Sequence, residues 1–104
     1  MSFVAYDLSL DYVRAVAPML AALRSRDPSL ARQAQSAVAS ISLNLAEGSG
    51  RRGADRRHLY RIAYGSFREV RAAFDVAVAL GLVDAPPASV LTDRLGAILY
   101  RLTR

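Results

Sequence analysis

Residues 27–48, with the sequence DPSLARQAQSAVASISLNLAEG, determine the fold class. Asp27 followed by Pro28 is typical of a helix N-cap and first turn, and Gly48 is typical of a helix end. Between them, apolar residues recur every three or four positions, which is the spacing of one buried helical face. These residues are Leu30, Ala34, Ala37, Val38, Ile41 and Leu45. The stretch therefore predicts an amphipathic helix.

The same periodicity predicts three further helices. Their expected ranges are residues 9–23, residues 55–80 before Gly81, and residues 90–102 after Pro86-Pro87. A chain of 104 residues suits one domain, and short connections between helices favour antiparallel neighbours. The sequence therefore predicts a single all-α domain over residues 1–104, an up-down-up-down antiparallel four-helix bundle.

The expected helix over residues 55–80 is apolar on more than one face. Its inner face would consist of Leu59, Ile62, Ala63, Ser66, Val70, Ala73, Phe74, Ala77 and Leu80. Away from this stripe lie Tyr60, Tyr64, Phe67 and Val78. A helix with two apolar faces usually has a second partner, which favours a homo-oligomer. The alternative is that the aromatic residues widen one core face.

The charge of the chain is concentrated in one segment. All 14 basic residues are arginines, and nine acidic residues leave a formal net charge of +5. Residues 51–61 alone contain five arginines and one acidic residue, a net charge of +4: the arginines are Arg51, Arg52, Arg56, Arg57 and Arg61. The planar guanidinium group binds phosphate in a bidentate way. This segment therefore predicts contacts to the phosphates of a nucleic acid.

Arginines also continue along one edge of the third expected helix. Arg57, Arg61 and Arg68 are spaced by four and seven residues, and Arg71 follows three positions later. A basic ridge of this kind can follow a phosphate backbone. We therefore expect Arg68 and Arg71 to make outer contacts, with an ordinary solvated helix face as the alternative.

The sequence GSGRRG at residues 48–53 matches the pattern GxGxxG. The dinucleotide-binding form of this pattern requires a strand before it and a parallel sheet around it. Here a helix is expected before it, so the match is a false positive for dinucleotide binding. The backbone amides at the start of the next helix could still bind an anion; the alternative is a flexible turn.

Candidate catalytic and metal-binding residues are few. His58 is the only histidine, with Asp55 one helical turn before it, and the chain has two glutamates and no cysteine. A di-iron bundle requires several glutamates and two histidines, and neighbouring arginines would repel a cation. The sequence therefore predicts no catalytic residue, no metal and no cofactor.

The two glutamates lie among small and polar residues. We expect Glu47 and Glu69 to form a structural polar network with Asn44 and Ser66, because a buried carboxylate needs hydrogen-bonding partners. Such a network would fix the register of the helices. The alternative is a pair of carboxylates for acid–base chemistry, although no nucleophile accompanies them.

The sequence also bears on the compartment. No stretch reaches the roughly 18 apolar residues of a membrane span, and the first residues lack the basic cluster of a signal peptide. The absence of cysteine is compatible with a reducing compartment. We therefore expect a cytoplasmic protein without a membrane partner.

Three short motifs, in order, resemble those of a known family. Residues 40–51, SISLNLAEGSGR, resemble the signature SIxxNIAEGxGR of the bacterial four helix bundle protein family. Residues 63–69, AYGSFRE, resemble its AxGSxxE motif, and residues 78–83, VALGLV, resemble its "A..LGyi" helix end. The resemblance covers residues 30–104. Leu45 replaces the usual isoleucine, and residues 57–59 replace the more common acidic and aromatic start of the third helix.

The resemblance implies a ring-like homopentamer that binds nucleic acid without known catalysis. The family includes proteins encoded by intervening sequences within large-subunit ribosomal RNA genes. It also includes the accessory variability determinant of diversity-generating retroelements, for which the resemblance implies a reverse transcriptase partner. Our leading hypothesis is therefore a non-enzymatic, oligomeric bundle that contacts RNA or DNA phosphates with little base specificity. The alternative is an adaptor that organises a reverse transcriptase.

Overall fold

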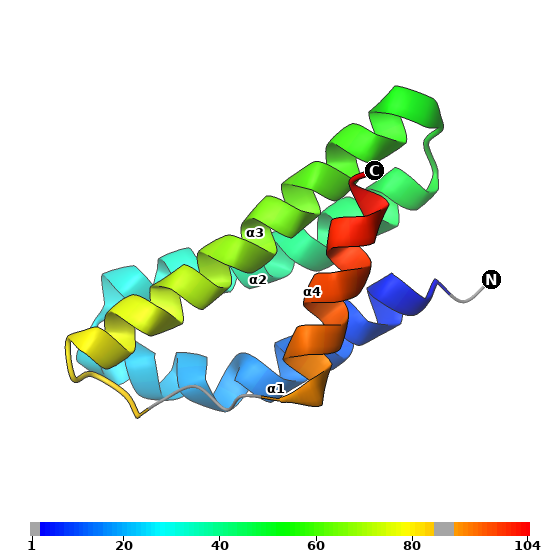
Figure 1. Cartoon of the computed structure of the whole chain (residues 1–104). Coiled ribbons are helices and arrows are strands. Elements are labelled where there is room, and N and C mark those ends of the chain that lie inside the picture. The colour runs from blue at the N-terminus through cyan, green and yellow to red at the C-terminus, as the bar shows by residue number, and fades with distance from the viewer. Residues whose placement is uncertain (1–2, 85–88) are drawn as a thin grey trace.

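Four α-helices account for the regular structure of the described residues. The computed structural model describes residues 3–84 and 89–104. Its helices are α1 (Val4–Arg26), α2 (Pro28–Ser49), α3 (Gly53–Ala79) and α4 (Val90–Leu102), as Figure 1 shows. No strand occurs within the described residues. The predicted all-α class and the four predicted helices are confirmed, whereas Pro86-Pro87 lie outside the described residues.

Side chains fix the start of two helices. The Asp27 carboxylate accepts a hydrogen bond from the Leu30 amide at 3.0 Å, and Pro28 occupies the first turn of α2, as the sequence predicts. At the start of α4, the Ser89 hydroxyl accepts a hydrogen bond from the Thr92 amide at 3.1 Å. Each cap satisfies a backbone donor that has no partner within the helix.

Helix α1 is longer than the prediction for residues 9–23. It begins at Val4 and ends at Arg26, and Pro18 lies inside it. Ala5 and Leu8 are buried and continue the face that carries Tyr12. The burial of these residues against the other helices extends α1 by more than a turn beyond the apolar periodicity that the sequence displays.

The core contains residues from all four helices. Helix α2 packs between α1 and α3, and the shorter α4 packs against α1 and α3, inclined to the long helices in Figure 1. Buried aromatic rings of α1 and α3 meet in this core, with the centres of Tyr12 and Phe67 5.6 Å apart. Leu95 and Leu99 anchor α4 there and are fully buried.

The buried face of α3 differs from the predicted one. Tyr60 and Phe67, placed by the sequence outside the main stripe, are only 6% and 2% exposed. Ile62 and Leu80, predicted on the inner face, are 38% and 63% exposed. The reason is that other segments pack against the aromatic side of α3. Phe3 contacts Tyr60, Tyr12 of α1 contacts Phe67, and Tyr100 of α4 contacts Tyr64. The aromatic residues therefore widen the core face.

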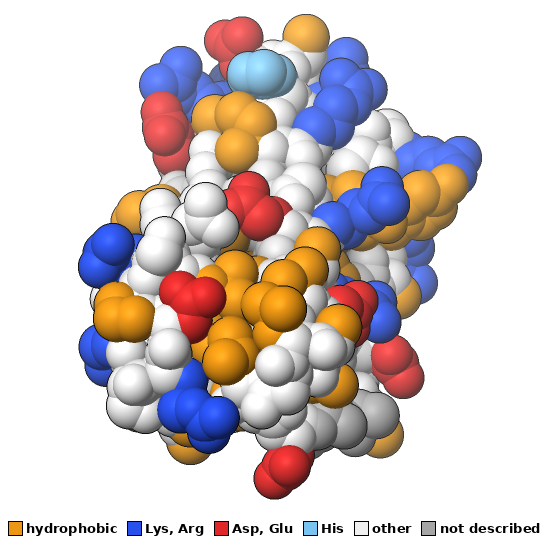
Figure 2. Space-filling view, turned by 90° about the vertical axis from the view of Figure 1, so that its left-hand side faces the viewer, with side chains coloured by type: hydrophobic (Ala, Val, Ile, Leu, Met, Phe, Trp, Pro, Cys, Tyr) orange, Lys and Arg blue, Asp and Glu red, His pale blue; other side chains and the backbone are white. Residues whose placement is uncertain are grey.

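A second, smaller apolar cluster closes the end of the molecule where α1 ends, α2 begins and α3 ends. Its buried members are Leu23, Ala31 and Ala77. Gly81, predicted to end the third helix, has φ = 74°, a left-handed conformation that glycine adopts without strain. Figure 2 looks onto this end and shows hydrophobic side chains gathered there, with charged side chains around them. None of the helices described is long and apolar enough to cross a membrane.

Candidate nucleic-acid interface

A close approach between α2 and α3 positions the arginine-rich segment. Gly48 is buried against Tyr60, and a Cβ atom at Gly48 would lie 2.6 Å from the Cε1 atom of that ring. Only glycine fits at this distance. The chain then turns at Gly53, whose φ of 56° favours glycine. The GxGxxG sequence thus connects two closely packed helices.

Two of the predicted arginines have partners beside this turn. Arg56 donates from Nε to the Gly48 carbonyl at 3.3 Å and from a terminal nitrogen to the Ser49 carbonyl at 3.5 Å, so it caps the end of α2. Arg51 forms an exposed ion pair with Glu47 at 3.0 Å. An exposed pair of this kind contributes little to stability, about 0 to 1 kcal/mol. Both arginines keep their guanidinium groups at the surface.

A groove of about 440 Å³ lies where the start of α3 meets the end of α4 and the residue before α1. We call it the basic groove, and its lining consists of Phe3, Gly53, Arg56, Arg57, Tyr60, Arg101, Leu102 and Arg104. Four of these residues are arginines, and none carries a carboxylate side chain. The side chains that line the groove therefore carry a net positive charge, which favours a polyanion.

Arg101 and Arg104 were missed by the sequence reasoning. They are more than 40 residues from Arg57 in the chain, and only the packing of α4 against α3 brings the three together. A sequence signal existed, since both lie in or just after the last turn of the final helix. That signal is weak, because basic residues are common at helix ends, where they complement the helix dipole.

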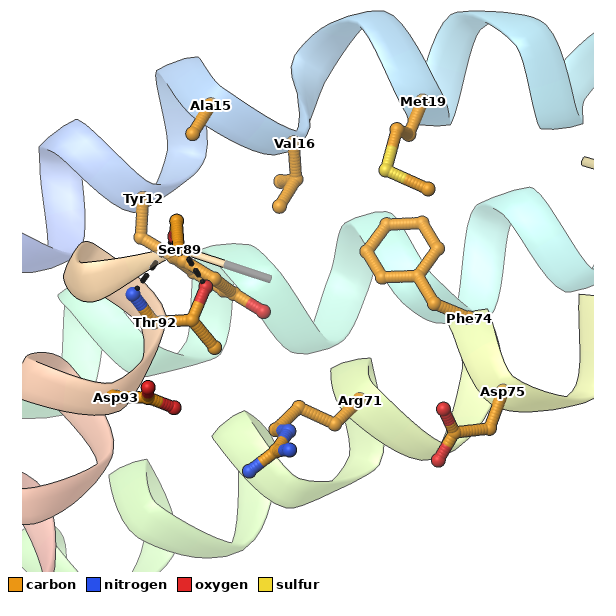
Figure 3. A pocket seen from close by; sticks show the side chains of 10 residues that line it. All are labelled: Tyr12, Ala15, Val16, Met19, Arg71, Phe74, Asp75, Ser89, Thr92 and Asp93. Carbon is orange, nitrogen blue, oxygen red and sulfur yellow. Dashed lines mark hydrogen bonds between the residues drawn. The ribbon is translucent and has the colours of Figure 1, made fainter. Parts of the chain in front are cut away.

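The remaining predicted arginines lie in two different settings. Arg52, Arg61 and Arg68 are exposed, and their side chains make no hydrogen bond or ion pair within the described residues. Arg71 instead lines a separate cavity of about 200 Å³, together with Asp75 and Asp93 (Figure 3). The ridge predicted along α3 therefore ends in a region of mixed charge.

Burial is the main influence on the pKa of Tyr12, a residue that lines the same cavity as Arg71. Desolvation raises the pKa of Tyr12 to about 12, and the positive charge of Arg71 opposes this rise. At the basic groove, burial likewise raises the pKa of Tyr60, while the charge of Arg56 lowers it. In both settings an arginine lies close enough to a buried phenol to influence its ionisation.

Of the four residues predicted to form a polar network, the structure brings two together. Ser66 donates to the Ser40 hydroxyl at 2.8 Å, and Asn44 donates to the Ser40 carbonyl at 2.8 Å and to its hydroxyl at 3.0 Å. These bonds link α2 to α3. Glu47 lies at the surface with Arg51, and Glu69 is exposed.

The pair of Asp55 and His58, for which the sequence predicts no metal, also lies at the surface. His58 and Asp55 are both exposed near the start of α3. In residues 3–84 and 89–104, no three histidine, cysteine or acidic side chains come close enough to hold a metal ion.

These features define an all-α, arginine-rich protein with an open cationic surface at one end of the helices. The family model described as 23S rRNA-intervening sequence protein matches residues 2–104, and the chain belongs to this family. The resemblance found in the sequence motifs is thereby confirmed. No curated protein and no solved structure matches the chain.

Proposed function

We propose that the protein is a non-enzymatic nucleic-acid-binding bundle that holds phosphates in the basic groove. The observation that carries this proposal is the convergence of four arginines, from the start of α3 and from the end of α4 and the residues after it, without a carboxylate side chain among the groove residues. Guanidinium groups form short, charge-assisted pairs with phosphate oxygens. Because the groove is open to solvent, much of the binding free energy would come from the release of counterions.

The remaining exposed arginines would extend this contact along the backbone of the ligand. Arg52, Arg61 and Arg68 have no competing intramolecular partner in the described part of the chain. Contacts to phosphates alone read no base sequence. We therefore propose binding with little base specificity, and the family description favours RNA as the first ligand to examine.

Assembly forms part of the same proposal. We propose that the four helices run up-down-up-down and that copies associate into a ring-like homopentamer. Large apolar side chains left exposed on α2, on α3 and directly after α3 support association: they are Leu43, Ile62, Val76 and Leu80. Five copies at +5 each would carry a formal charge of +25, which strengthens the attraction for a polyanion.

The test compares two triple variants with the same loss of charge. One carries Arg57→Gln, Arg101→Gln and Arg104→Gln in the basic groove. The control carries Arg24→Gln, Arg26→Gln and Arg32→Gln at the other end of the helices, where all three side chains are exposed. Affinity for a labelled single-stranded RNA is measured by fluorescence anisotropy between about 0.05 and 0.3 M salt.

Three lost phosphate contacts should reduce the salt slope by about 2 and the affinity near 0.1 M salt by about 100-fold. The control should lose less than about 5-fold, because distant charges are screened over about 10 Å. Equal losses in the two variants, or a salt slope near zero for the unmodified protein, would contradict the proposal.

The adaptor hypothesis stays a prediction. It places a reverse transcriptase, rather than nucleic acid, on the bundle, and the exposed apolar side chains of α2 and α3 are the observation that favours a protein partner. Its test is co-purification with a reverse transcriptase encoded beside this gene. Retained co-purification by the groove triple variant would support the hypothesis, and its absence from the unmodified protein would contradict it.

A further inference from the structure

An exposed aromatic ring lies beside the basic groove. Tyr100, in the last turns of α4, is 45% exposed and directly precedes the groove residues Arg101 and Leu102. Its ring centre lies 5.8 Å from that of Tyr64 on α3, in an edge-to-face arrangement. This contact between helices holds the Tyr100 ring in place.

Arg104 connects this ring to the groove. The residue lines the groove, and its Cζ atom lies 4.6 Å from the centre of the Tyr100 ring. The guanidinium group also donates to the Tyr100 hydroxyl. Arg104 lies beyond the end of α4 and is exposed. An exposed contact between a guanidinium and a ring is weak enough for a competing flat group to replace it.

We propose that the basic groove selects single-stranded nucleic acid, with one unpaired base stacked on Tyr100 and the adjoining phosphates on Arg57 and Arg101. This inference rests on the proposed function and specifies its ligand. A nucleic-acid base is flat and takes the position of the Arg104 guanidinium over the ring. Arg104 then moves onto the free face of the base or onto a phosphate.

The groove has room for a single nucleotide unit. Its volume of about 440 Å³ is that of a site for one small organic unit, such as a nucleotide. In a duplex the bases are stacked on one another and are unavailable to Tyr100, so only the phosphates could interact with the arginines. A free strand can use the ring and the arginines together, as is common for single-strand binding. Every base has a flat face, so the stacking adds no sequence preference.

The experiment uses three ligands of about 12 nucleotides, a length within the range of single-strand sites. They are a single-stranded RNA, the same strand with abasic positions, and an RNA duplex. The abasic strand keeps the phosphates and lacks the bases. We expect the unmodified protein to bind the intact strand about 5-fold to 10-fold more tightly than the abasic strand, an effect within the range for one stacked base.

Two substitutions of the same residue separate stacking from structure. Tyr100→Phe keeps the ring and should keep the preference for the intact strand. Tyr100→Leu keeps an apolar contact for Tyr64 but lacks the ring, and should bind the intact and abasic strands equally. Affinity for the duplex should change by less than about 2-fold in both variants, since phosphate contacts alone are involved.

The outcomes separate this inference from the proposed function. Salt-dependent binding with equal affinities of the unmodified protein for intact and abasic strands would overturn the inference and leave the proposed function in place. Loss of the preference in Tyr100→Phe would also overturn the inference, because the ring is retained. No salt-dependent binding to any of the three ligands would overturn both. The comparison of strands on the unmodified protein keeps the inference testable even where Tyr100→Leu does not fold.

Discussion

Arg57 and Arg71 lie on the same helix, at its surface, and yet their surroundings differ completely. Arg57 lines the basic groove with three other arginines, whereas Arg71 shares its cavity with Asp75 and Asp93. Helix α4 accounts for the difference, because its last turn contributes arginines beside Arg57 and its first turn contributes Asp93 beside Arg71. The charge that a helix edge presents is therefore set by the helix packed against it.

The largest expected effect comes from loosening α4, on which this contrast depends. A helix of 13 residues is not stable alone, and Leu99 is fully buried in the core. We expect Leu99→Ala to lower the free energy of unfolding by about 3 kcal/mol. Denaturant unfolding followed by circular dichroism measures this loss.

Val90→Ala provides the control on the same helix, since Val90 is 82% exposed. This substitution should change the free energy of unfolding by no more than about 0.5 kcal/mol. Similar losses for Leu99→Ala and Val90→Ala would show that α4 is not anchored through its buried face, and the account of the two arginine settings would then be wrong.

A smaller effect is expected from reversing the charge of each arginine in turn. Arg57→Glu removes one phosphate contact and adds a repulsive charge to the groove, so RNA affinity should fall by about 10-fold near 0.1 M salt. Arg71→Glu should change RNA affinity by less than about 3-fold. It should instead lower the melting temperature, because a third carboxylate would join Asp75 and Asp93 in one cavity.

Anisotropy titrations and thermal melts on both variants test this reversal of effects. If Arg71→Glu weakened RNA binding as much as Arg57→Glu, the ridge predicted along α3 would act as one continuous site. The basic groove and the Arg71 cavity would then not be separate in RNA binding.

The helices could be predicted from the sequence because their signals are local. The cap at Asp27, the apolar spacing over residues 27–48 and the glycine stop near Gly81 each involve residues within a few turns. The α3 face was harder to predict. Whether Tyr60 or Ile62 is buried depends on which segments pack against each side of α3, and helical spacing carries no information about that.

The candidate site was predictable only in part, for the same reason. The cluster around Arg56 and Arg57 is evident as a run of charge, but Arg101 and Arg104 join it through tertiary packing. Conversely, Arg71 fits the helical ridge and yet shares its cavity with Asp75 of its own helix and Asp93 of α4. The run of arginines in the sequence shows which end of the molecule is basic. Only the packing of α4 determines which arginines line the basic groove.

The smallest expected effect is on the pH dependence of stability. It concerns two buried phenols, Tyr12 in the Arg71 cavity and Tyr60 in the basic groove. Chains without lysine or cysteine have only tyrosines to titrate between pH 9 and about 12, because arginine stays protonated there. Burial raises the pKa of Tyr12 from its usual value of 10.0 to about 12. In the unfolded chain the phenol ionises near 10, so the unfolded state binds fewer protons above that pH. Stability linked to Tyr12 is therefore fully present below pH 10 and is lost as the pH rises to about 12.

Tyr12→Phe and Tyr60→Phe compare the cavity with the basic groove. Burial raises the pKa of both phenols, and the pKa of Tyr12 reaches about 12. Melting temperatures measured from pH 9 to 11.5 should therefore decline less steeply in Tyr12→Phe than in the unmodified protein, with a weaker flattening in Tyr60→Phe. Equal flattening would mean that burial raises the pKa of the two phenols alike. In that case the two ends of α3 would differ in the signs of their surface charges but not in how strongly burial acts beneath them.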